Sequence, residues 1–349
     1  MKTKIILLAA ALALLCSCGW RTGTNNDGQT QTATVSGGGG PKAEAASDTR
    51  QFPKLSVPSV YGDDANASRE YVLEHYWDGF FKGDWKTTPE AILGVPDAEV
   101  EQALSNYIEI LLIMKSLSTP DEPHFYNKAR ESIKKLFSQL EAKQLADTSA
   151  KTYLRFTEKA SSYLFDPNSP MRDEDYYLPF VEGMAVSPCT REDMRNAYRY
   201  EAKQCRTNGY GQTVPNFSFK DARGNKSSLY AYKVDYTMLF FSNPGCNSCQ
   251  EIIDDISTCK YISPMIKDKR LAIVNIYIDE EVDKWRDYLS NYPSNWVNGY
   301  DYTFSLRDSG SFDIRAIPSL YLLDSRKRVL LKDAPTGRVL DYLEKHYDQ

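Results

Sequence analysis

Apolar side chains recur every three or four residues between about Asp64 and Asn208, the spacing that places them on one face of an amphipathic helix. Three stripes of this kind are clear: Val100, Leu104, Ile108 and Leu111; Phe125, Ala129, Ile133, Leu136 and Leu140; Tyr153, Phe156, Ala160 and Leu164. Beyond two prolines at 167 and 170, further helices are predicted to start near Glu174 and to run from about Arg191 to Thr207. We therefore expect an all-α helical domain over residues 59–210.

After Gly211 the pattern changes to short apolar strands that alternate with helices. The predicted strands are Tyr236 to Phe241, Leu271 to Ile278, Leu320 to Leu323 and Val329 to Leu331. The predicted helices run from Cys249 to about Cys259, from Val282 to about Asn291 and from Gly337 to Tyr347. Parallel strands with crossover helices, closed by a hairpin, form a mixed sheet. Residues 211–349 are thus expected to be an α/β domain, and the chain an α+β protein of two domains.

The first residues are typical of an export signal. Two lysines precede an uncharged apolar run, Ile5 to Leu15, that is too short to span a bilayer. The run ends in Leu15-Cys16-Ser17-Cys18, which resembles a bacterial lipobox, whose last cysteine is lipidated and becomes the mature N-terminus. We expect a signal peptide over residues 1–17, a lipid anchor on Cys18 and a flexible tether over residues 18–58. The alternative is a plain signal peptide with incidental cysteines.

The charge of the chain bears on which classes of partner it can bind. Its 42 Lys and Arg against 47 Asp and Glu give a net charge of −5, and the sequence has no block of like charges. A nucleic-acid surface needs a basic stripe that releases counterions, so no nucleic-acid partner is expected. Because no acidic run follows Cys18, we expect the anchored protein to face the periplasm, on the inner or the outer membrane.

Five cysteines remain after removal of the signal peptide and acylation of Cys18: Cys189, Cys205, Cys246, Cys249 and Cys259. A long chain with five cysteines is not a disulfide scaffold. Cys189 and Cys205 lie at opposite ends of a predicted helix, about 24 Å apart, whereas a disulfide needs Cα atoms within about 7 Å. We do not expect them to bond to each other. Pairing of Cys259 with either of them stays open.

The motif Cys246-Asn247-Ser248-Cys249 lies where the strand Tyr236 to Phe241 gives way to a helix. This position puts the first sulfur beside free backbone N–H groups at the positive end of the helix dipole, which favours the thiolate. Cys246 is then the nucleophile of thiol–disulfide exchange, and Cys249, one turn further on, is the resolving cysteine.

Two other interpretations compete for this motif. A zinc site needs more ligands than one CxxC, and the three histidines, His75, His124 and His346, are far from it in sequence, so no metal is expected. An inert structural disulfide would close a loop of only four residues and constrain the unfolded chain little. We therefore favour the exchange reaction.

The pair Ile317-Pro318 immediately precedes the strand that begins at Ser319. A proline at the start of a strand marks a special turn, often with a cis peptide bond, and leaves backbone polar groups available to a bound peptide. An ordinary trans proline that opens an edge strand is the alternative.

Three motifs follow one another in the C-terminal part: Val214 to Asp221 with Gly224, Pro244 to Cys249, and Phe312 to Asp324. In this order they resemble the TlpA/ResA-like thioredoxin family, within the group that includes the alkyl hydroperoxide reductase relatives. The resemblance implies a thioredoxin-like fold, a redox-active Cys246–Cys249 disulfide with no dissociable cofactor, and a docking groove shaped by Ile317, Pro318, Pro244 and Gly245. The helical part resembles a domain of unknown function that precedes thioredoxin domains in lipoproteins of some Gram-negative anaerobes, which implies no activity.

Three positions depart from the family pattern. Gly245 stands where the family usually has Trp, and Phe240 and Ile252 occupy the two positions at which relatives carry a buried carboxylate. Without such a base, proton transfer to and from Cys249 is expected to be slower.

The function expected from these residues is that of a membrane-anchored periplasmic thiol–disulfide oxidoreductase. Its partners would be protein thiols and disulfides of the periplasm and a membrane or soluble redox partner. One alternative is a non-catalytic binding lipoprotein with a vestigial thioredoxin domain. A thiol peroxidase is disfavoured because Asn243 replaces the Thr or Ser that those enzymes use to bind peroxide.

Overall fold

The structure is a computed structural model that describes residues 49–308 and 310–347. The predicted signal peptide, the lipid-attachment residue Cys18 and most of the predicted tether lie outside the described residues. Within the described part, no helix combines the length and the apolar character that crossing a bilayer requires. Contacts group Ser47–Gln349 into one compact unit that includes both the helix-rich and the sheet-containing regions.

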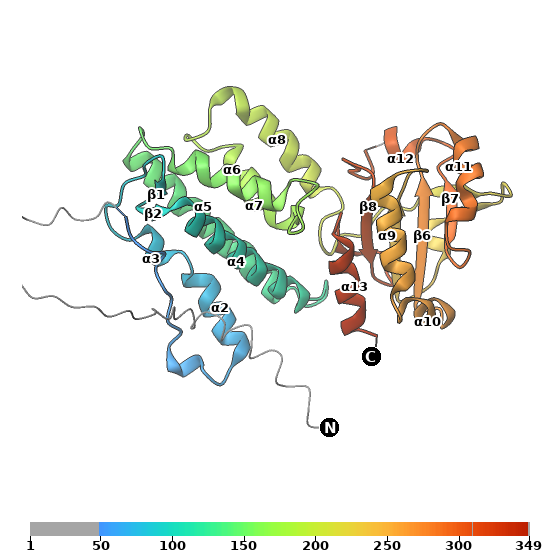
Figure 1. Cartoon of the computed structure of the whole chain (residues 1–349), viewed down its shortest axis with the longest axis horizontal. Helices are drawn as coiled ribbons and strands as arrows, with labels where there is room; N and C mark the ends of the chain where they lie inside the picture. Colours follow the sequence, from blue (N-terminus) through green and yellow to red (C-terminus); the bar gives the residue numbers. More distant parts are fainter. Residues whose placement is uncertain (1–48, 309, 348–349) are drawn as a thin grey trace, which may run out of the picture. The chain divides into compact units, whose positions relative to one another are not determined.

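The N-terminal region is built from helices (Figure 1). They are α2 (Ala65–His75), α3 (Asp78–Phe81), α4 (Asp97–Ser116), α5 (His124–Ala146), α6 (Thr152–Leu164), α7 (Glu174–Met184) and α8 (Glu192–Arg206), with a short 3-10 helix at Ser59–Tyr61. The apolar stripes face inward as their spacing predicts, except that Phe125 is half-buried and its neighbour Tyr126 takes the inner position. Trp77, Phe80, Tyr107 and Phe156 are at most 3% exposed and stack edge to face in the middle of this core.

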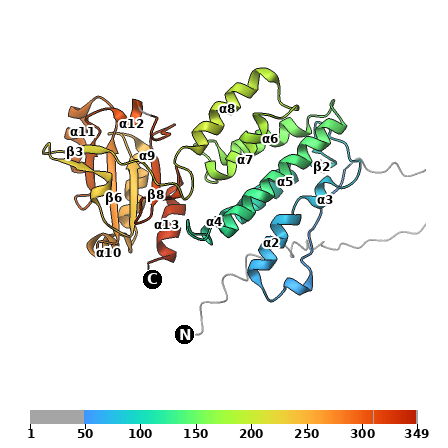
Figure 2. The ribbon, with the colours of Figure 1, turned by 180° about the vertical axis from the view of Figure 1, so that it is seen from behind.

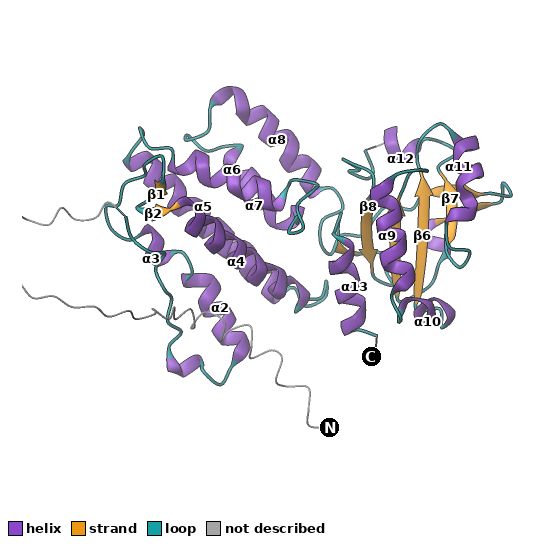
Figure 3. Ribbon diagram, in the orientation of Figure 1, coloured by secondary structure: helices purple, strands orange, loops and turns teal. Residues whose placement is uncertain are grey.

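The expectation of an all-α region was wrong in one detail. Two short strands, β1 (Ala91–Ile92) and β2 (Val95–Pro96), pair as an antiparallel hairpin inside this region (Figure 3). Leu93 and Gly94 between them have positive φ angles, of 49° and 76°, which suits a tight two-residue turn. Strands of two residues are too short to show an alternating pattern, so periodicity could not find them.

The C-terminal region is a seven-stranded mixed sheet with the strand order β4-β3-β7-β6-β5-β8-β9. The strands are β3 (Ser218–Asp221), β4 (Lys226–Ser228), β5 (Tyr236–Phe241), β6 (Leu271–Tyr277), β7 (Val297–Tyr300), β8 (Ser319–Leu323) and β9 (Val329–Leu331). β5, β6 and β7 are parallel, whereas β8 and β9 close the sheet as an antiparallel hairpin. The sequence had indicated β5, β6, β8 and β9, and this mixed α/β sheet agrees with the expected fold class.

Alternate residues of β5 face opposite sides of the sheet, as strand geometry requires. Met238 and Phe240 pack into one apolar cluster, and Leu239 and Phe241 into another. Helices that contribute to the first cluster are α9 (Asn247–Thr258), α10 (Ile262–Lys267), α11 (Val282–Tyr288) and α13 (Thr336–Lys345), and α12 (Ser305–Asp308) contributes to the second. Figure 2 shows the sheet from behind. The central strand β5 therefore ends at Phe241 with α9 packed against it, which positions the predicted redox motif.

Candidate active site

The turn from β5 to α9 carries the cysteine motif. β5 ends at Phe241, Cys246 is the N-cap residue of α9, and the helix itself begins at Asn247. Gly245 has a φ of +71°, a left-handed backbone conformation that residues with a Cβ rarely adopt. A glycine at this position thus fits the backbone of this particular turn, and it leaves the position next to Cys246 exposed.

Cys246 is half-buried, and its Sγ accepts a hydrogen bond from the backbone N–H of Cys249 at 3.2 Å. This is the N-cap interaction of α9, which satisfies one of the helix's free donors. A sulfur in this place lies at the end of the helix where negative charge is stabilised. The geometry therefore suits Cys246 to the role of an accessible nucleophile.

Cys249 lies one turn into α9 and is only 1% exposed, within the apolar cluster that also holds Phe240. Burial raises the pKa of the Cys249 thiol to about 12, and its neighbour Cys246 acts in the same direction. A backbone N–H of Asn243 favours the thiolate but does not reverse this pKa shift. Cys249 is therefore held as a protonated thiol behind the accessible sulfur of Cys246.

The segment with Ile317 and Pro318 lies at the same end of the sheet. Phe241, the last residue of β5, pairs with Ser319, the first residue of β8, and the Ile317–Pro318 peptide bond is cis. Ile317 and Cys246 both pack against the apolar cluster that contains Cys249. The fold thus brings Cys246 and Cys249 close to the Ile317–Pro318 pair, although they are far apart in the sequence. All of them lie at the end of the sheet where β5 finishes and β8 begins.

Ser242 and Asn275, two polar residues next to the motif, were not singled out from the sequence, and Asn243 was named only in the argument against a peroxidase. Ser242 is fully buried and donates a hydrogen bond to Asn275 Oδ1 at 2.6 Å, and Asn243 Nδ2 donates to Asp279 Oδ2 at 2.7 Å. Asn275 is the one polar side chain in the apolar strand β6, the only signal that could have drawn attention to it. These bonds tie the β5–α9 turn to β6 and to the residues that follow it.

The two positions at which the resemblance to the TlpA/ResA-like family implies a carboxylate are apolar here and pack against the cluster around Cys249. Phe240 is fully buried and Ile252 is partly buried. Tyr292, whose pKa burial raises to about 12, belongs to the same cluster, and its hydroxyl oxygen lies 3.3 Å from Ser242 Oγ. The polar side chains near Cys249 are thus those of Ser242 and Tyr292, and positions 240 and 252 supply no acid.

The other three described cysteines are free thiols away from this turn. Cys205 is fully buried in the helical core, and burial raises its pKa. Cys189 is half-buried, and burial raises its pKa as well. Cys259 is the C-cap residue of α9, at the opposite end of that helix from Cys246. None of the described residues form a cluster of three or more side chains of the types that hold metals.

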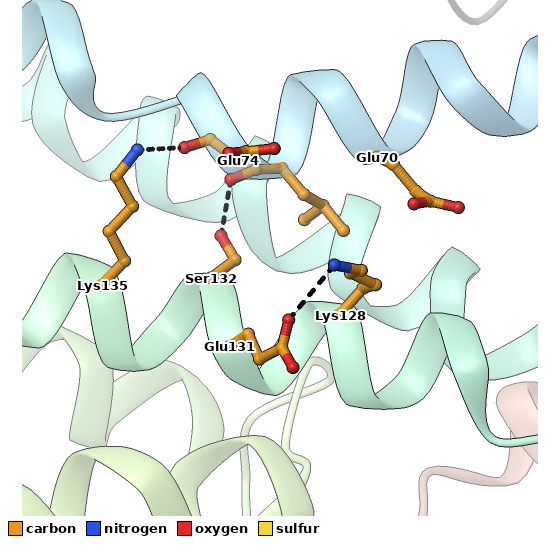
Figure 4. A pocket seen from close by; sticks show the side chains of 7 residues that line it. Glu70, Glu74, Lys128, Glu131, Ser132 and Lys135 are labelled. Carbon is orange, nitrogen blue, oxygen red and sulfur yellow. Dashed lines mark hydrogen bonds and ion pairs between the residues drawn. The ribbon is translucent and has the colours of Figure 1, made fainter.

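A pocket between α2 and α5 is lined by Glu70, Leu73, Glu74, Lys128, Glu131, Ser132 and Lys135 (Figure 4). Lys135 Nζ donates to the Glu74 carbonyl oxygen and Ser132 Oγ to that of Leu73, each at 2.6 Å. These bonds hold α2 against α5, so the polar groups of the pocket serve the packing of the helical region.

Comparisons with known proteins show which proteins the chain is similar to. Residues 17–208 match the family described as Domain of unknown function (DUF5106), and none of the curated proteins matches the chain. A thioredoxin-like protein from Bacteroides caccae is 34% identical, with a TM-score of 0.67 over 85% of this chain and 99% of its own.

Two shorter solved structures match part of the chain. The C-terminal domain of an uncharacterized protein from Bacteroides fragilis is 39% identical over 40% of this chain and 99% of its own, with a TM-score of 0.38. The thioredoxin domain of a thiol-disulfide oxidoreductase from Bacteroides vulgatus is 22% identical over 40% of this chain and 98% of its own, with a TM-score of 0.36. By the family match and the Bacteroides caccae relative, the chain belongs to the DUF5106 family and is a thioredoxin-like protein.

Proposed function

We propose that this protein is a thiol–disulfide oxidoreductase that exchanges disulfides with protein substrates through Cys246 and Cys249. The observation that carries the proposal is the pairing of an accessible sulfur at the start of α9 with a buried thiol one turn further on. A purely structural disulfide does not require that one of its sulfurs be accessible at a helix N-terminus. The Ile317–Pro318 pair, at the same end of the sheet, would bind the backbone of the substrate.

The reaction proceeds in two exchanges. In the first, the Cys246 thiolate attacks one sulfur of a substrate disulfide, forms a mixed disulfide and releases the other substrate sulfur as a thiolate. In the second, Cys249 loses its proton and attacks the Cys246 sulfur, which releases the second substrate thiolate and forms the Cys246–Cys249 disulfide. Two electrons pass to the substrate, and a dithiol partner returns the pair to its reduced form. The reverse sequence oxidises a substrate dithiol.

The second exchange is the slower one in this proposal. Cys249 must become a thiolate, and its burial opposes that charge. Burial and the neighbouring Cys246 both raise the pKa of Cys249. When Cys246 enters the mixed disulfide, it loses its charge and its hydrogen bond to Cys249, so its effect on that pKa disappears. Burial remains, and no carboxylate at positions 240 or 252 accepts the proton.

Reduction of insulin by dithiothreitol tests the proposed function. Insulin holds its chains together by disulfides, and the chains precipitate when these are reduced. The protein should bring the onset of precipitation forward in proportion to its concentration. An onset equal to that with dithiothreitol alone would contradict the proposal.

We further propose that a lipid on Cys18 holds the protein at the periplasmic side of a membrane. The apolar run that ends at the lipobox-like motif supports this placement. Two or more acyl chains give a stable anchor, so the wild-type protein should sediment with membranes and Cys18→Ala should appear in the soluble fraction. Intact mass of the N-terminal peptide reports the acylation, and equal partitioning of both forms would contradict the anchor.

A further inference from the structure

The residues that lead into the cis proline are held by the helical region. We call residues 311–318 the docking segment. Asn208 Nδ2, just after α8, donates to the Ser311 carbonyl oxygen at 2.7 Å. Gln204 Nε2, within α8, donates to Asp313 Oδ1 at 2.7 Å, and Asp313 is 7% exposed. Side chains of the helical region therefore bind the docking segment at alternate residues.

Arg315 makes the third of these contacts. Its Nη1 donates to the Phe165 carbonyl oxygen at 2.8 Å, and its guanidinium carbon lies 4.1 Å from the centre of the Phe165 ring. Its Nη2 lies 2.8 Å from Glu174 Oε1. A guanidinium that stacks on a ring and meets a carboxylate at the same time has a fixed orientation. Arg315 is two residues before Ile317. Because its side chain is held in one orientation, the backbone of Ile317 and Pro318 is restricted in position as well.

The partner carboxylate is itself fixed. Glu174, the first residue of α7, is only 2% exposed and meets Lys332 Nζ at 2.6 Å. Lys332 also donates to the Thr207 carbonyl oxygen at 2.7 Å, at the end of α8. Charged groups buried in this way do little for net stability compared with apolar residues, but they define geometry. The contact is therefore better suited to positioning than to holding the two regions together.

We propose that the helical region is part of the substrate-docking site, because Arg315, held by Glu174 and Phe165, sets the position of the docking segment. This inference rests on the proposed function and adds a cause for substrate preference. A protein disulfide lies along the docking segment and depends on its position, whereas a small disulfide reaches Cys246 without it. Arg315 is a positioning residue that acts through Ile317 and Pro318.

Steady-state kinetics of Arg315→Ala with two substrates test this inference. With insulin, KM should rise about tenfold, the effect of losing one orienting charged contact, while kcat stays within about twofold. With oxidised glutathione, the rate should stay within about twofold of wild type. Arg315→Lys keeps the charge and should recover part of the loss. A rise in KM for neither substrate, or an equal loss for both, would overturn the inference.

The structure offers a matched control in Arg328. Its Nη1 and Nη2 bind the two oxygens of Asp121 at 2.7 and 2.8 Å, so it too links the sheet to the helical region. Leu323, five residues before it, pairs with Thr237 at the start of β5, the opposite end of that strand from Cys246. Arg328→Ala should leave KM for both substrates unchanged.

Hydrogen exchange separates this inference from the proposed function. Amides of the docking segment should exchange faster in Arg315→Ala and Glu174→Gln than in wild type, and at the wild-type rate in Arg328→Ala. Hydrogen exchange does not require the protein to turn over substrate. It therefore tests the positioning role of Arg315 even if the insulin assay contradicts the proposed oxidoreductase function. If Arg315→Ala does not fold, the same comparison with Arg315→Lys and Glu174→Gln decides. Unchanged exchange in all variants would overturn the inference.

Discussion

Replacing Cys246 with serine is expected to lower the catalysed rate of insulin reduction on the order of a thousand-fold or more, to that of dithiothreitol alone. A serine hydroxyl retains the N-cap hydrogen bond to α9 but forms no disulfide, so the first exchange cannot take place. The fold of the turn should survive the change, which the far-ultraviolet circular dichroism spectrum checks.

Cys259→Ser provides the matched control for this prediction. Cys259 is also a half-buried thiol, but it is the C-cap residue of α9, at the opposite end of that helix from Cys246. This variant should retain the wild-type rate. Equal rates for wild type and Cys246→Ser would leave the redox assignment without support.

A second large effect is expected on stability. Lys115 of α4 is 5% exposed, and its Nζ lies 2.9 Å from Asp173 and 2.6 Å from Asp175, both nearly buried. Lys115→Met removes the cation that the two buried carboxylates share. Arg338 still lies 3.1 Å from Asp173, but among the described contacts it forms no ion pair with Asp175. The free energy of unfolding should fall by about 3–5 kcal/mol, the typical result of breaking a buried ion pair from one side. Urea denaturation measures this difference.

The pH dependence gives this prediction its sign. Burial alone would lower the pKa of Lys115 and raise that of Asp175, but their mutual attraction outweighs it, so the pKa of Lys115 is raised and that of Asp175 is lowered. The stabilisation is therefore present between the ordinary values of 3.8 for Asp and 10.5 for Lys, and it fades as the pH falls below or rises above that window. The gap between wild type and Lys115→Met should be widest near neutral pH.

Lys128→Met is the control for the stability prediction. Lys128 of α5 meets Glu131 at 3.4 Å, with the two side chains 46% and 66% exposed. An exposed pair of this kind contributes little, so its loss should change the free energy of unfolding by no more than about 0.5 kcal/mol. Similar small changes for both lysines would contradict the account of the buried network.

Much of the fold follows from local patterns. The positions of α4, α5 and α6 were predicted from their apolar stripes. A helix with one buried face repeats its apolar residues about every 3.6 positions, so the sequence shows it directly. The last helix of that region was expected from about Arg191 to Thr207 and spans Glu192–Arg206. The strand β7 (Val297–Tyr300) was missed because its burial is uneven and its centre holds Asn298 and Gly299, which are poor strand formers.

The site was predictable as far as its motifs reach. Cys246, Cys249 and Pro318 lie at one end of the sheet, as the order of their motifs predicted, and their roles in disulfide exchange stay proposals. The contact of Arg315 with Glu174 could not be predicted, because charged side chains are most often solvated and no local pattern links α7 with the segment before Pro318. Such a contact becomes visible only when the helical region and the sheet are packed together.

The central claim is that Cys246 is the sulfur that bonds to substrate. The most direct measurement is covalent trapping with Cys249→Ser, which lacks the thiol that resolves the mixed disulfide. After incubation with insulin disulfides, peptide mass spectrometry should find a substrate chain on Cys246 that dithiothreitol releases. A variant that forms no adduct, or one whose adduct lies on Cys189, Cys205 or Cys259, would contradict the account.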